Sequence, residues 1–398
     1  MTSAANNKIL TQRLSQPLVR AIAHYRQQCP HWQELTQAVD LAAITDMADL
    51  HRLPIIAKDD FPQAQELHPP FGNLRCFGTG QPWHLYRSPG PIYEFDTYCD
   101  NFWQLQTALE AAGFDRQDRI ANAFSYHYTP AGMMFDEGAR RLGCQVLPAG
   151  PGNSEQLLAA IAHLQITAYV GTPDFLKIIL DKAQEMGTDI KSLNKALVTG
   201  GYLSPAIRQQ CQDKGISVYQ CYATADVGLI AYEKANTDGL VCADNIWVEI
   251  VNPQTLQPVA DGETGEVVVS RLVADAPLLR FATGDLSAIV SSPEQASLQL
   301  KGWLGRSDAA VKVKGLFIRP VQLQNLLAQF ESITDAQLQI DSDNHLDRIC
   351  LKVCAPGADA ELLSQVQSRF KAITGLTTDV EATSSSFAAL IADKRVVE

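Results

Sequence analysis

Residues 277–320 read PLLRFATGDLSAIVSSPEQASLQLKGWLGRSDAAVKVKGLFIRP and contain two short polar groups, Thr-Gly-Asp at 283–285 and Gly-Arg-Ser-Asp at 305–308. The residues between them alternate and turn like a β-hairpin. Asp285 follows an apolar, strand-like run and Gly284, which readily adopts a positive φ. A carboxylate at such a strand end can accept hydrogen bonds from vicinal hydroxyls, as on a ribose, and the planar fork of Arg306 suits phosphate or carboxylate. A hairpin with an Asp-capped turn is the structural alternative.

The whole chain has the composition of a soluble globular protein with more than one core. It has 398 residues, 46% hydrophobic and 19% charged, and a net charge of −12. This charge argues against a nucleic-acid or anionic-membrane partner, because both favour a basic surface. The N-terminal residues lack the apolar core of a signal peptide, and no apolar run reaches the roughly 18 residues of a membrane span. We therefore expect a cytoplasmic protein.

The nine cysteines are scattered without a CxxC pair. Cys350 and Cys354, near His345, form the one loose cluster, but they lie in an alternating strand pattern. We interpret them as core thiols rather than metal ligands, and scattered thiols fit a reducing compartment.

Hydrophobic periodicity predicts a large α/β domain and a small α+β domain. Strand and helix patterns alternate with short loops from about 115 to 225, which indicates parallel α/β units. Residues 8–68 read as helices and turns, 240–318 as mostly β, and 318–398 as β/α. The composition changes after Asp308, so we expect a large N-terminal domain with mixed sheets, 1–304, and a small domain, 305–398. The helices expected in and before the alternating region are 95–113, 129–142, 154–164, 173–186 and 204–214.

The order of short motifs resembles the adenylate-forming superfamily, specifically its phenylacetate–CoA ligase-like branch. The matching segments run through most of the chain and are 149–156 (AGPGNSEQ), 171–176 (GTPDFL), 198–204 (VTGGYLS), 222–226 (YATAD), 281–286 (FATGDL), 305–308 (GRSD) and 314–320 (KGLFIRP). Each is weak alone, but their common order is a strong signal. The resemblance implies a mobile C-terminal domain and a nucleotide bound between the two domains.

The resemblance also implies roles for individual residues. Asp226, Lys394 and Arg306 would be catalytic, Asp226 would hold Mg²⁺, and Asp308 would be the hinge. The nucleotide would contact Ser88, Gly90, Gly200, Gly201, Tyr222, Ala223, Thr224, Asp285 and Arg306. The acyl pocket would be lined by Tyr126, His127, Met133, Met134, Phe135, Gly171, Thr172 and Pro173. This set is largely aromatic and apolar, which suits a flat aryl ring, although ordinary core packing is the alternative.

Three departures from the family pattern stand beside these matches. The phosphate loop is shortened to 87–92 (RSPGPI), where two prolines remove N–H donors and only Ser88 and Gly90 remain of the family's pattern. Asp226 replaces the family's glutamate, and Ala225 a hydroxyl residue. The family's C-terminal lysine aligns with Ala392, and Lys394, the one nearby candidate, would face the other side of a strand.

Two functional hypotheses follow from the matches and the departures. In the first, the protein activates an aromatic acid with ATP and Mg²⁺ to an aryl-AMP and passes the acyl group to CoA, a carrier thiol or an amine, in a specialised biosynthetic pathway. In the second, a degenerate member binds AMP, an aryl-adenylate or an aryl ligand without efficient adenylation. A homodimer is left open.

Overall fold

The computed structural model describes residues 3–45, 47–75, 82–88, 92–99, 101–273, 276–290, 298–307, 311–313, 316–318, 320–330, 332–343 and 346–395. The contacts between Cα atoms divide the chain into a large unit, Met1–Ser307, and a small unit, Asp308–Glu398. The boundary expected from the sequence lies a few residues earlier. The difference arises because Gly305 and Arg306 form strand β15, which pairs with β13 of the large unit.

An eight-stranded sheet lies at the centre of the large unit, in the order β14-β10-β9-β8-β7-β6-β4-β5. The strands from β5 to β8 are parallel, whereas β8, β9, β10 and β14 pair antiparallel with one another. The bounds are β4 (Arg119–Asn122), β5 (Gln145–Pro148), β6 (Ala168–Gly171), β7 (Lys195–Val198), β8 (Ser217–Thr224), β9 (Gly228–Glu233), β10 (Leu240–Cys242) and β14 (Gln299–Leu300). The predicted α/β class with mixed sheets is confirmed.

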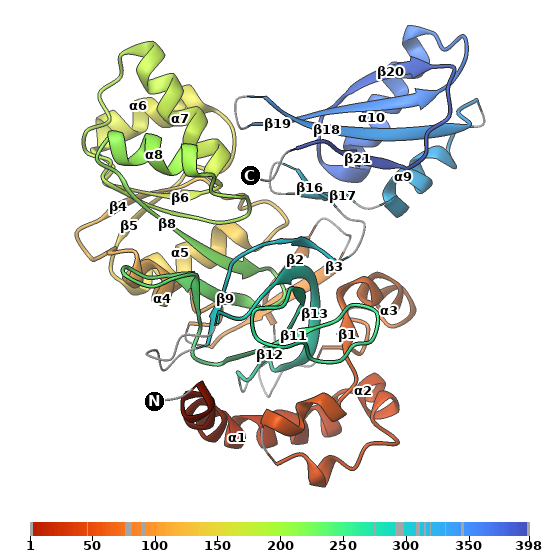
Figure 1. Ribbon diagram of the computed structural model, residues 1–398. Coiled ribbons are helices and arrows are strands. Elements are labelled where there is room, and N and C mark those ends of the chain that lie inside the picture. The colour runs from red at the N-terminus through yellow and green to blue at the C-terminus, as the bar shows by residue number, and fades with distance from the viewer. Residues whose placement is uncertain are drawn as a thin grey trace. The chain divides into compact units, whose positions relative to one another are not determined.

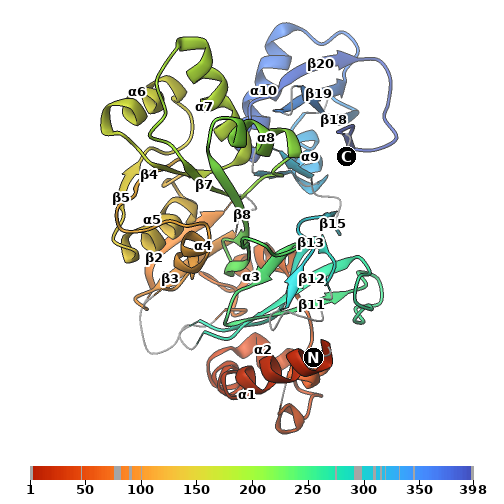
Figure 2. The ribbon, with the colours of Figure 1, turned by 60° about the vertical axis from the view of Figure 1, so that its left-hand side comes forward.

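Helices cover both faces of the parallel strands (Figures 1 and 2). The helices α4 (Leu105–Ala111) and α5 (Ala131–Arg141) pack on the face to which Ile120 points. The helices α6 (Ser154–Leu164), α7 (Pro173–Met186) and α8 (Pro205–Asp213) pack on the opposite face, where Ala121 lies. Neighbouring residues of one strand thus reach two different cores, which is why these strands read as continuous apolar runs.

Four of the helices expected in this region are confirmed within two residues at each end. Capping side chains specify the starts of two of them, α7 and α8. Thr172 Oγ1 accepts a 3.3 Å hydrogen bond from the Phe175 N–H at the start of α7, and Ser204 Oγ accepts one from the Ile207 N–H at the start of α8. Proline follows each cap as the first helical residue, where its missing N–H has no cost.

The helix expected over 95–113 is wrong in its first half. Residues up to Thr97 belong to a hairpin of β2 (Pro82–Ser88) and β3 (Ile92–Thr97), and α4 begins only at Leu105. The hairpin is held by Asp96, which accepts hydrogen bonds from the Tyr86 hydroxyl (2.8 Å) and the His84 N–H (2.8 Å). Tyr98, just after β3, is 80% exposed, so the helical face expected over this stretch does not form here. Cross-strand partners therefore override the helical spacing of the apolar residues.

A second sheet, in the order β1-β13-β12-β11, carries the segment quoted at the start. Its strands are β1 (Ile56–Ala57), β11 (Ile246–Val251), β12 (Gly265–Arg271) and β13 (Leu278–Ser287), and β15 (Gly305–Arg306) pairs with β13. β13 is buried along almost its whole length. The mostly β interpretation of 240–318 is confirmed.

The N-terminal residues are helical, as expected. They form α1 (Ser3–Gln28), α2 (Pro30–Leu35), α3 (Phe61–Leu67) and the short 3₁₀ segments η1 (Leu41–Ala43), η2 (Met47–Arg52) and η3 (Lys58–Asp60). The buried Tyr25 hydroxyl donates a 2.7 Å hydrogen bond to the carbonyl of Pro277. This contact fixes α1 against the residue that precedes β13.

The small unit is an α+β domain, as predicted. Its sheet has the order β20-β19-β18-β21, with α9 and α10 packed on it around Phe370 and Leu338. The bounds are β16 (Val311–Val313), β17 (Leu316–Ile318), α9 (Pro320–Leu327), β18 (Asp335–Asp343), β19 (Leu346–Cys354), α10 (Ala360–Thr374), β20 (Asp379–Thr383) and β21 (Ile391–Asp393).

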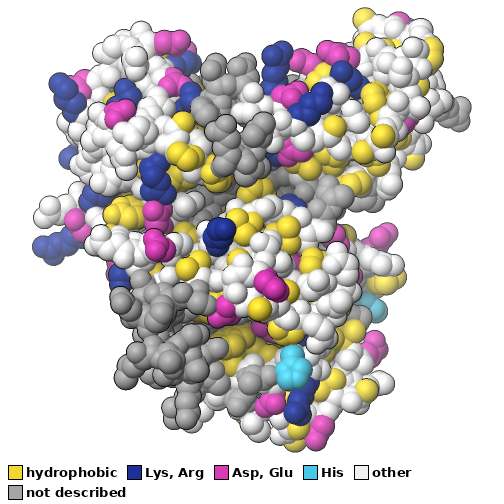
Figure 3. Space-filling model, viewed as in Figure 1, with side chains coloured by type: hydrophobic (Ala, Val, Ile, Leu, Met, Phe, Trp, Pro, Cys, Tyr) yellow, Lys and Arg dark blue, Asp and Glu magenta, His cyan; other side chains and the backbone are white. Residues whose placement is uncertain are grey.

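The surface agrees with the composition, whereas one cysteine departs from the expectation of reduced thiols. Acidic and basic side chains are interspersed over the face shown in Figure 3, which has no continuous basic patch among the residues drawn in colour. Among the described helices, none combines the length and apolar character that crossing a bilayer requires. Cys350 and Cys354 are free thiols in β19, whereas Cys29, after α1, is disulfide-bonded.

Candidate functional site

Asp285 is the centre of a buried polar network. Its side chain lies in β13 and is 6% exposed. Its Oδ2 accepts a 2.8 Å hydrogen bond from the Tyr222 hydroxyl, and its Oδ1 accepts bonds from Trp303 Nε1 (3.1 Å) and Arg306 Nη1 (3.0 Å). A carboxylate oxygen accepts about two hydrogen bonds. Oδ1 is therefore satisfied, whereas Oδ2 keeps one lone pair for a further donor such as a hydroxyl.

Gly284 and Arg306 are matched to each other. Gly284 has φ +76°, and a Cβ built at this position would collide with the Arg306 guanidinium. Arg306 Nη1 also donates a 3.0 Å hydrogen bond to the carbonyl of Thr283. The Arg306 and Asp285 side chains are only 5% and 6% exposed. The result is a buried ion pair that a side chain at position 284 would disrupt.

The end of β8 supplies the predicted nucleotide residues Tyr222, Ala223 and Thr224. Burial, and then the charge of Asp285, raise the pKa of Tyr222 well above its usual range, so its hydroxyl stays protonated and can donate to Asp285. Thr224 Oγ1 accepts a 3.2 Å hydrogen bond from the Val227 N–H and closes the turn that carries Asp226. β8 thus connects the Asp285 network with Asp226.

The predicted Gly200 and Gly201 lie beside the predicted Thr172 and Pro173. A Cβ at Gly200 (φ +78°) would lie 3.5 Å from Thr172 Cγ2, and one at Gly201 would lie 3.2 Å from Pro173 Cδ. Both pairs follow the carboxyl ends of parallel strands, β7 and β6. Ligands of open α/β sheets bind at this edge.

The predicted acyl-pocket residues divide into two groups. Met134 and Phe135 of α5 are 3% and 1% exposed, and Phe135 stacks on Phe124 with ring centroids 4.7 Å apart. His127 is exposed, whereas Tyr126 and Met133 are half-buried. The first group belongs to the core, and the second is partly or fully exposed. Gly171 is buried at the end of β6.

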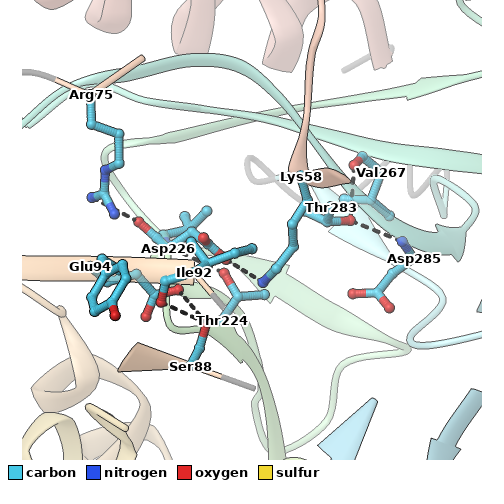
Figure 4. A network of polar contacts seen from close by, with 12 residues as sticks. Lys58, Arg75, Ser88, Ile92, Glu94, Thr224, Asp226, Val267, Thr283 and Asp285 are labelled. Carbon is cyan, nitrogen blue, oxygen red and sulfur yellow. Dashed lines mark hydrogen bonds and ion pairs between the residues drawn. The ribbon is translucent and has the colours of Figure 1, made fainter. Parts of the chain in front are cut away.

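Asp226 is fully buried and paired with a lysine. Its Oδ2 lies 2.5 Å from Lys58 Nζ, and its backbone carbonyl accepts a 3.2 Å hydrogen bond from Arg75 Nη2 (Figure 4). Burial alone would raise the pKa of Asp226, but the adjacent Lys58 outweighs it and holds the pKa below the ordinary value. Asp226 is therefore a carboxylate. Its second oxygen, Oδ1, has no hydrogen-bond partner.

Ser88 lies at the end of β2 and faces Glu94. Ser88 Oγ donates a 3.0 Å hydrogen bond to Glu94 Oε1, and both side chains are buried (Figure 4). Burial, and after it the charge of Asp226, raise the pKa of Glu94 to about 8. A neutral Glu94 carboxyl would donate to Asp226, and such a hydrogen bond is one of the contributions that lower the pKa of Asp226.

Gly90, Asp308 and Lys394 are the three remaining predicted residues. Gly90 and Asp308 are outside the described residues. Lys394 lies in the small unit, after β21, with an exposed side chain and a backbone N–H that donates to the carbonyl of Ile340. Their roles stay predictions.

The sequence interpretation missed four polar residues of this site, namely Lys58, Arg75, Glu94 and Trp303. Glu94 carried the clearest signal, because it is a charged residue among apolar neighbours in a strand-like run. Lys58 directly follows the apolar strand β1, and Trp303 precedes the Gly-Arg motif. Nothing in the sequence could place Arg75 against Asp226, because that contact joins segments 151 positions apart.

Comparison with known proteins agrees with the fold. The AMP-binding enzyme family matches residues 96–272. The chain is 28% identical over 291 residues to a phenylacetate–coenzyme A ligase of Escherichia coli (strain K12), covering 69% of this chain and 67% of that one. It is 24% identical over 352 residues to a phenylacetate–coenzyme A ligase of Aromatoleum evansii, covering 84% and 79%.

Solved structures share the fold. A 2-hydroxyisobutyryl-CoA ligase in complex with 2-HIB-AMP and CoA superimposes with a TM-score of 0.87 and 21% identity, covering 99% of this chain and 91% of that one. The amide bond synthetase McbA from Marinactinospora thermotolerans gives a TM-score of 0.59 at 15% identity, covering 76% and 65%.

The match of residues 96–272 to the AMP-binding enzyme family supports an adenylate-forming enzyme. The similarity to phenylacetate–CoA ligases over more than two thirds of the chain supports the phenylacetate–CoA ligase-like branch of that superfamily.

Proposed function

We propose that this enzyme activates a carboxylic acid with ATP to an acyl-adenylate and transfers the acyl group to coenzyme A. In the first step a carboxylate oxygen attacks the α-phosphorus and pyrophosphate leaves. In the second the CoA thiolate attacks the acyl carbon and AMP leaves. The observation that carries the proposal is the buried Asp285 network, because Oδ2 keeps one acceptor position in a site otherwise closed to water.

The residues around this network would hold the nucleotide. Asp285 Oδ2 would accept a hydrogen bond from a ribose hydroxyl, and Arg306 would supply positive charge near the phosphates. Tyr222 and the turn of Gly200 and Gly201 would contact the base, and Ala223 and Thr224 would border it. Ser88 and Gly90 would be what remains of the phosphate loop. Arg306 and Lys394 are the proposed catalytic cations.

Asp226 is the proposed ligand for Mg²⁺. Its unpartnered Oδ1 is a buried acceptor that a cation would satisfy. The described residues contain no group of three or more His, Cys, Asp or Glu side chains suited to a metal, so phosphates and water would complete the shell. Bound Mg²⁺ would neutralise phosphate charge during adenylation. The chain's own Lys58 holds Oδ2 and keeps the carboxylate ionised.

We propose an aromatic acid as the substrate. The half-buried Tyr126 and Met133, the exposed His127 and the turn at Thr172 support this, since Met134 and Phe135 provide a rigid base beneath them.

The pathway would be a specialised biosynthetic one in the cytoplasm, and a carrier thiol or an amine would be the alternative acceptor. Asp308 would be the hinge of a mobile small domain. A homodimer is part of the same proposal.

Pyrophosphate exchange into ATP tests the adenylation step directly. A panel of benzoic, anthranilic, phenylacetic and phenazine acids, with 2-hydroxyisobutyric acid as an aliphatic comparison, should give exchange with at least one aromatic acid. Exchange only with the aliphatic acid would overturn the aromatic assignment. No exchange with any acid, in a protein that binds AMP, would count against adenylation itself.

A degenerate binding protein is the second candidate, and the shortened phosphate loop favours it. The Ser88 hydroxyl donates to Glu94, so that proton is already used within the protein. Lys394 is exposed, and the aligned Ala392 carries no charge. Loss of a transition-state donor costs roughly 10²–10³ in rate. Calorimetry separates the candidates, because the degenerate protein should bind AMP or an acyl-adenylate much more tightly than ATP with Mg²⁺.

A further inference from the structure

The hairpin that lost the phosphate-loop donors carries a buried acid in their place. Ser88 and Ile92 are directly paired at the end of the β2–β3 hairpin, and Glu94 lies two residues further along β3. Glu94 is 0% exposed, and its Oε1 is fixed by the 3.0 Å hydrogen bond from Ser88. Its carboxyl group therefore has one defined orientation.

Two buried carboxylate oxygens in this region have no partner beyond the contact between their own two carboxyl groups. They are Glu94 Oε2 and Asp226 Oδ1, and both residues are 0% exposed. The two acids are close enough that the charge of Asp226 is the largest influence on Glu94 after burial. Figure 4 shows both side chains in one network with Lys58 and Arg75. Unpaired buried acceptors are costly, so a proton or a cation must satisfy this pair.

The surrounding charges decide when a cation can bind. Lys58 is 2.5 Å from the other oxygen of Asp226, and Arg75 contacts the Asp226 backbone. Lys58 and Arg75 already place two positive charges beside the two acids, so a divalent ion would leave an excess of positive charge. The phosphates of a nucleotide would offset that excess. A cation should therefore bind here together with a nucleoside triphosphate and only weakly without it.

We propose that Glu94 is a second carboxylate ligand, with Asp226, for the divalent cation that accompanies ATP. The inference rests on the proposed function, because it takes ATP as the ligand of the site. A pair of carboxylates plus phosphates and water is the usual protein environment of Mg²⁺. Glu94 would then compensate for the shorter arm of Asp226 and for the donors that the loop has lost.

Manganese binding tests the inference without relying on turnover. Mn²⁺ would be titrated into the protein with the non-cleavable α,β-methylene analogue of ATP, and free Mn²⁺ followed by electron paramagnetic resonance. Glu94→Gln should weaken Mn²⁺ binding to the complex at least about tenfold. Glu94→Asp, which keeps the charge but retracts it, should also weaken binding. Glu137→Gln, at a partly buried acid on α5, is the matched control and should leave the Mn²⁺ affinity unchanged.

The outcomes separate this inference from the proposed function. The Glu94→Gln amide imitates a protonated acid, so if Glu94 only shares a proton with Asp226, this variant will bind Mn²⁺ as tightly as the native protein. That result would overturn the inference while leaving the proposed function intact. AMP binding without metal, measured by calorimetry on the same samples, reports on the proposed function alone, and its absence in the native protein would overturn that function instead.

Discussion

Replacement of Asp285 by asparagine should destabilise the large unit strongly. The change removes the negative charge from an ion pair whose two side chains are only 5% and 6% exposed. Breaking a buried pair in this way costs about 3–5 kcal/mol. Because the asparagine oxygen can still accept bonds from Trp303 and Arg306, we expect the lower end, about 3 kcal/mol. That is a large share of a typical stability of about 5–15 kcal/mol.

The assay is urea unfolding followed by tryptophan fluorescence, since Trp303 contacts Asp285 directly. The double variant Asp285→Asn/Arg306→Gln is the control, because it removes both charges. Its loss should be smaller than the sum of the two single losses by about 1–3 kcal/mol. If Asp285→Asn costs less than about 1 kcal/mol, the pair is screened by solvent and the network does not exist as described.

The same variant should also weaken AMP binding. A hydrogen bond to a charged group contributes about 1.5–3 kcal/mol, which corresponds to roughly a 10- to 150-fold change in affinity. The measurement is calorimetry of AMP binding without denaturant, at a low temperature at which circular dichroism shows that the variant is still folded. An unchanged AMP affinity in a folded Asp285→Asn protein would show that the ribose does not contact this carboxylate.

Two further perturbations test individual features of the site. Because the folded pKa of Glu94 is raised to about 8, the native state keeps a proton that the unfolded state loses above its ordinary pKa of 4.5, so this group's contribution to stability falls as pH rises between these values. Glu94→Gln should flatten that decline in urea melts, and an equal slope in both proteins would contradict it. Gly284→Ala should cost more than Gly262→Ala, because both have positive φ but only Gly284 faces the Arg306 guanidinium, whereas nothing lies near Gly262. Equal losses of stability for the two variants in thermal melts would contradict the steric clash between position 284 and Arg306.

Local patterns in the sequence predicted most of the fold. Helices α6 and α7 have the expected bounds because their apolar residues recur at helical spacing, and Thr172 also caps α7. The prediction was wrong for the first half of the helix expected over 95–113. Its apolar residues fit the period of a strand as well as that of a helix, and Asp96 hydrogen-bonds to residues of the neighbouring strand. Strand pairing with a distant partner is not visible in local spacing.

Site residues that belong to a sequence motif could be predicted, whereas contacts between distant segments of the chain could not. Asp285 and Tyr222 were named from separate motifs, and the structure brings them within 2.8 Å. Lys58 and Asp226 are 168 positions apart, and no local pattern marks their contact. The burial of Met134 and Phe135 likewise depends on packing between α5 and the sheet, which residue type alone does not specify.

Isothermal titration of AMP into the native protein at neutral pH tests the central claim most directly. That claim is that the polar pocket around Asp285 receives a nucleotide. We predict saturable binding of one AMP per chain, retained when magnesium is removed with a chelator. Absence of detectable binding by AMP, and by ATP with Mg²⁺, to a folded protein would contradict it.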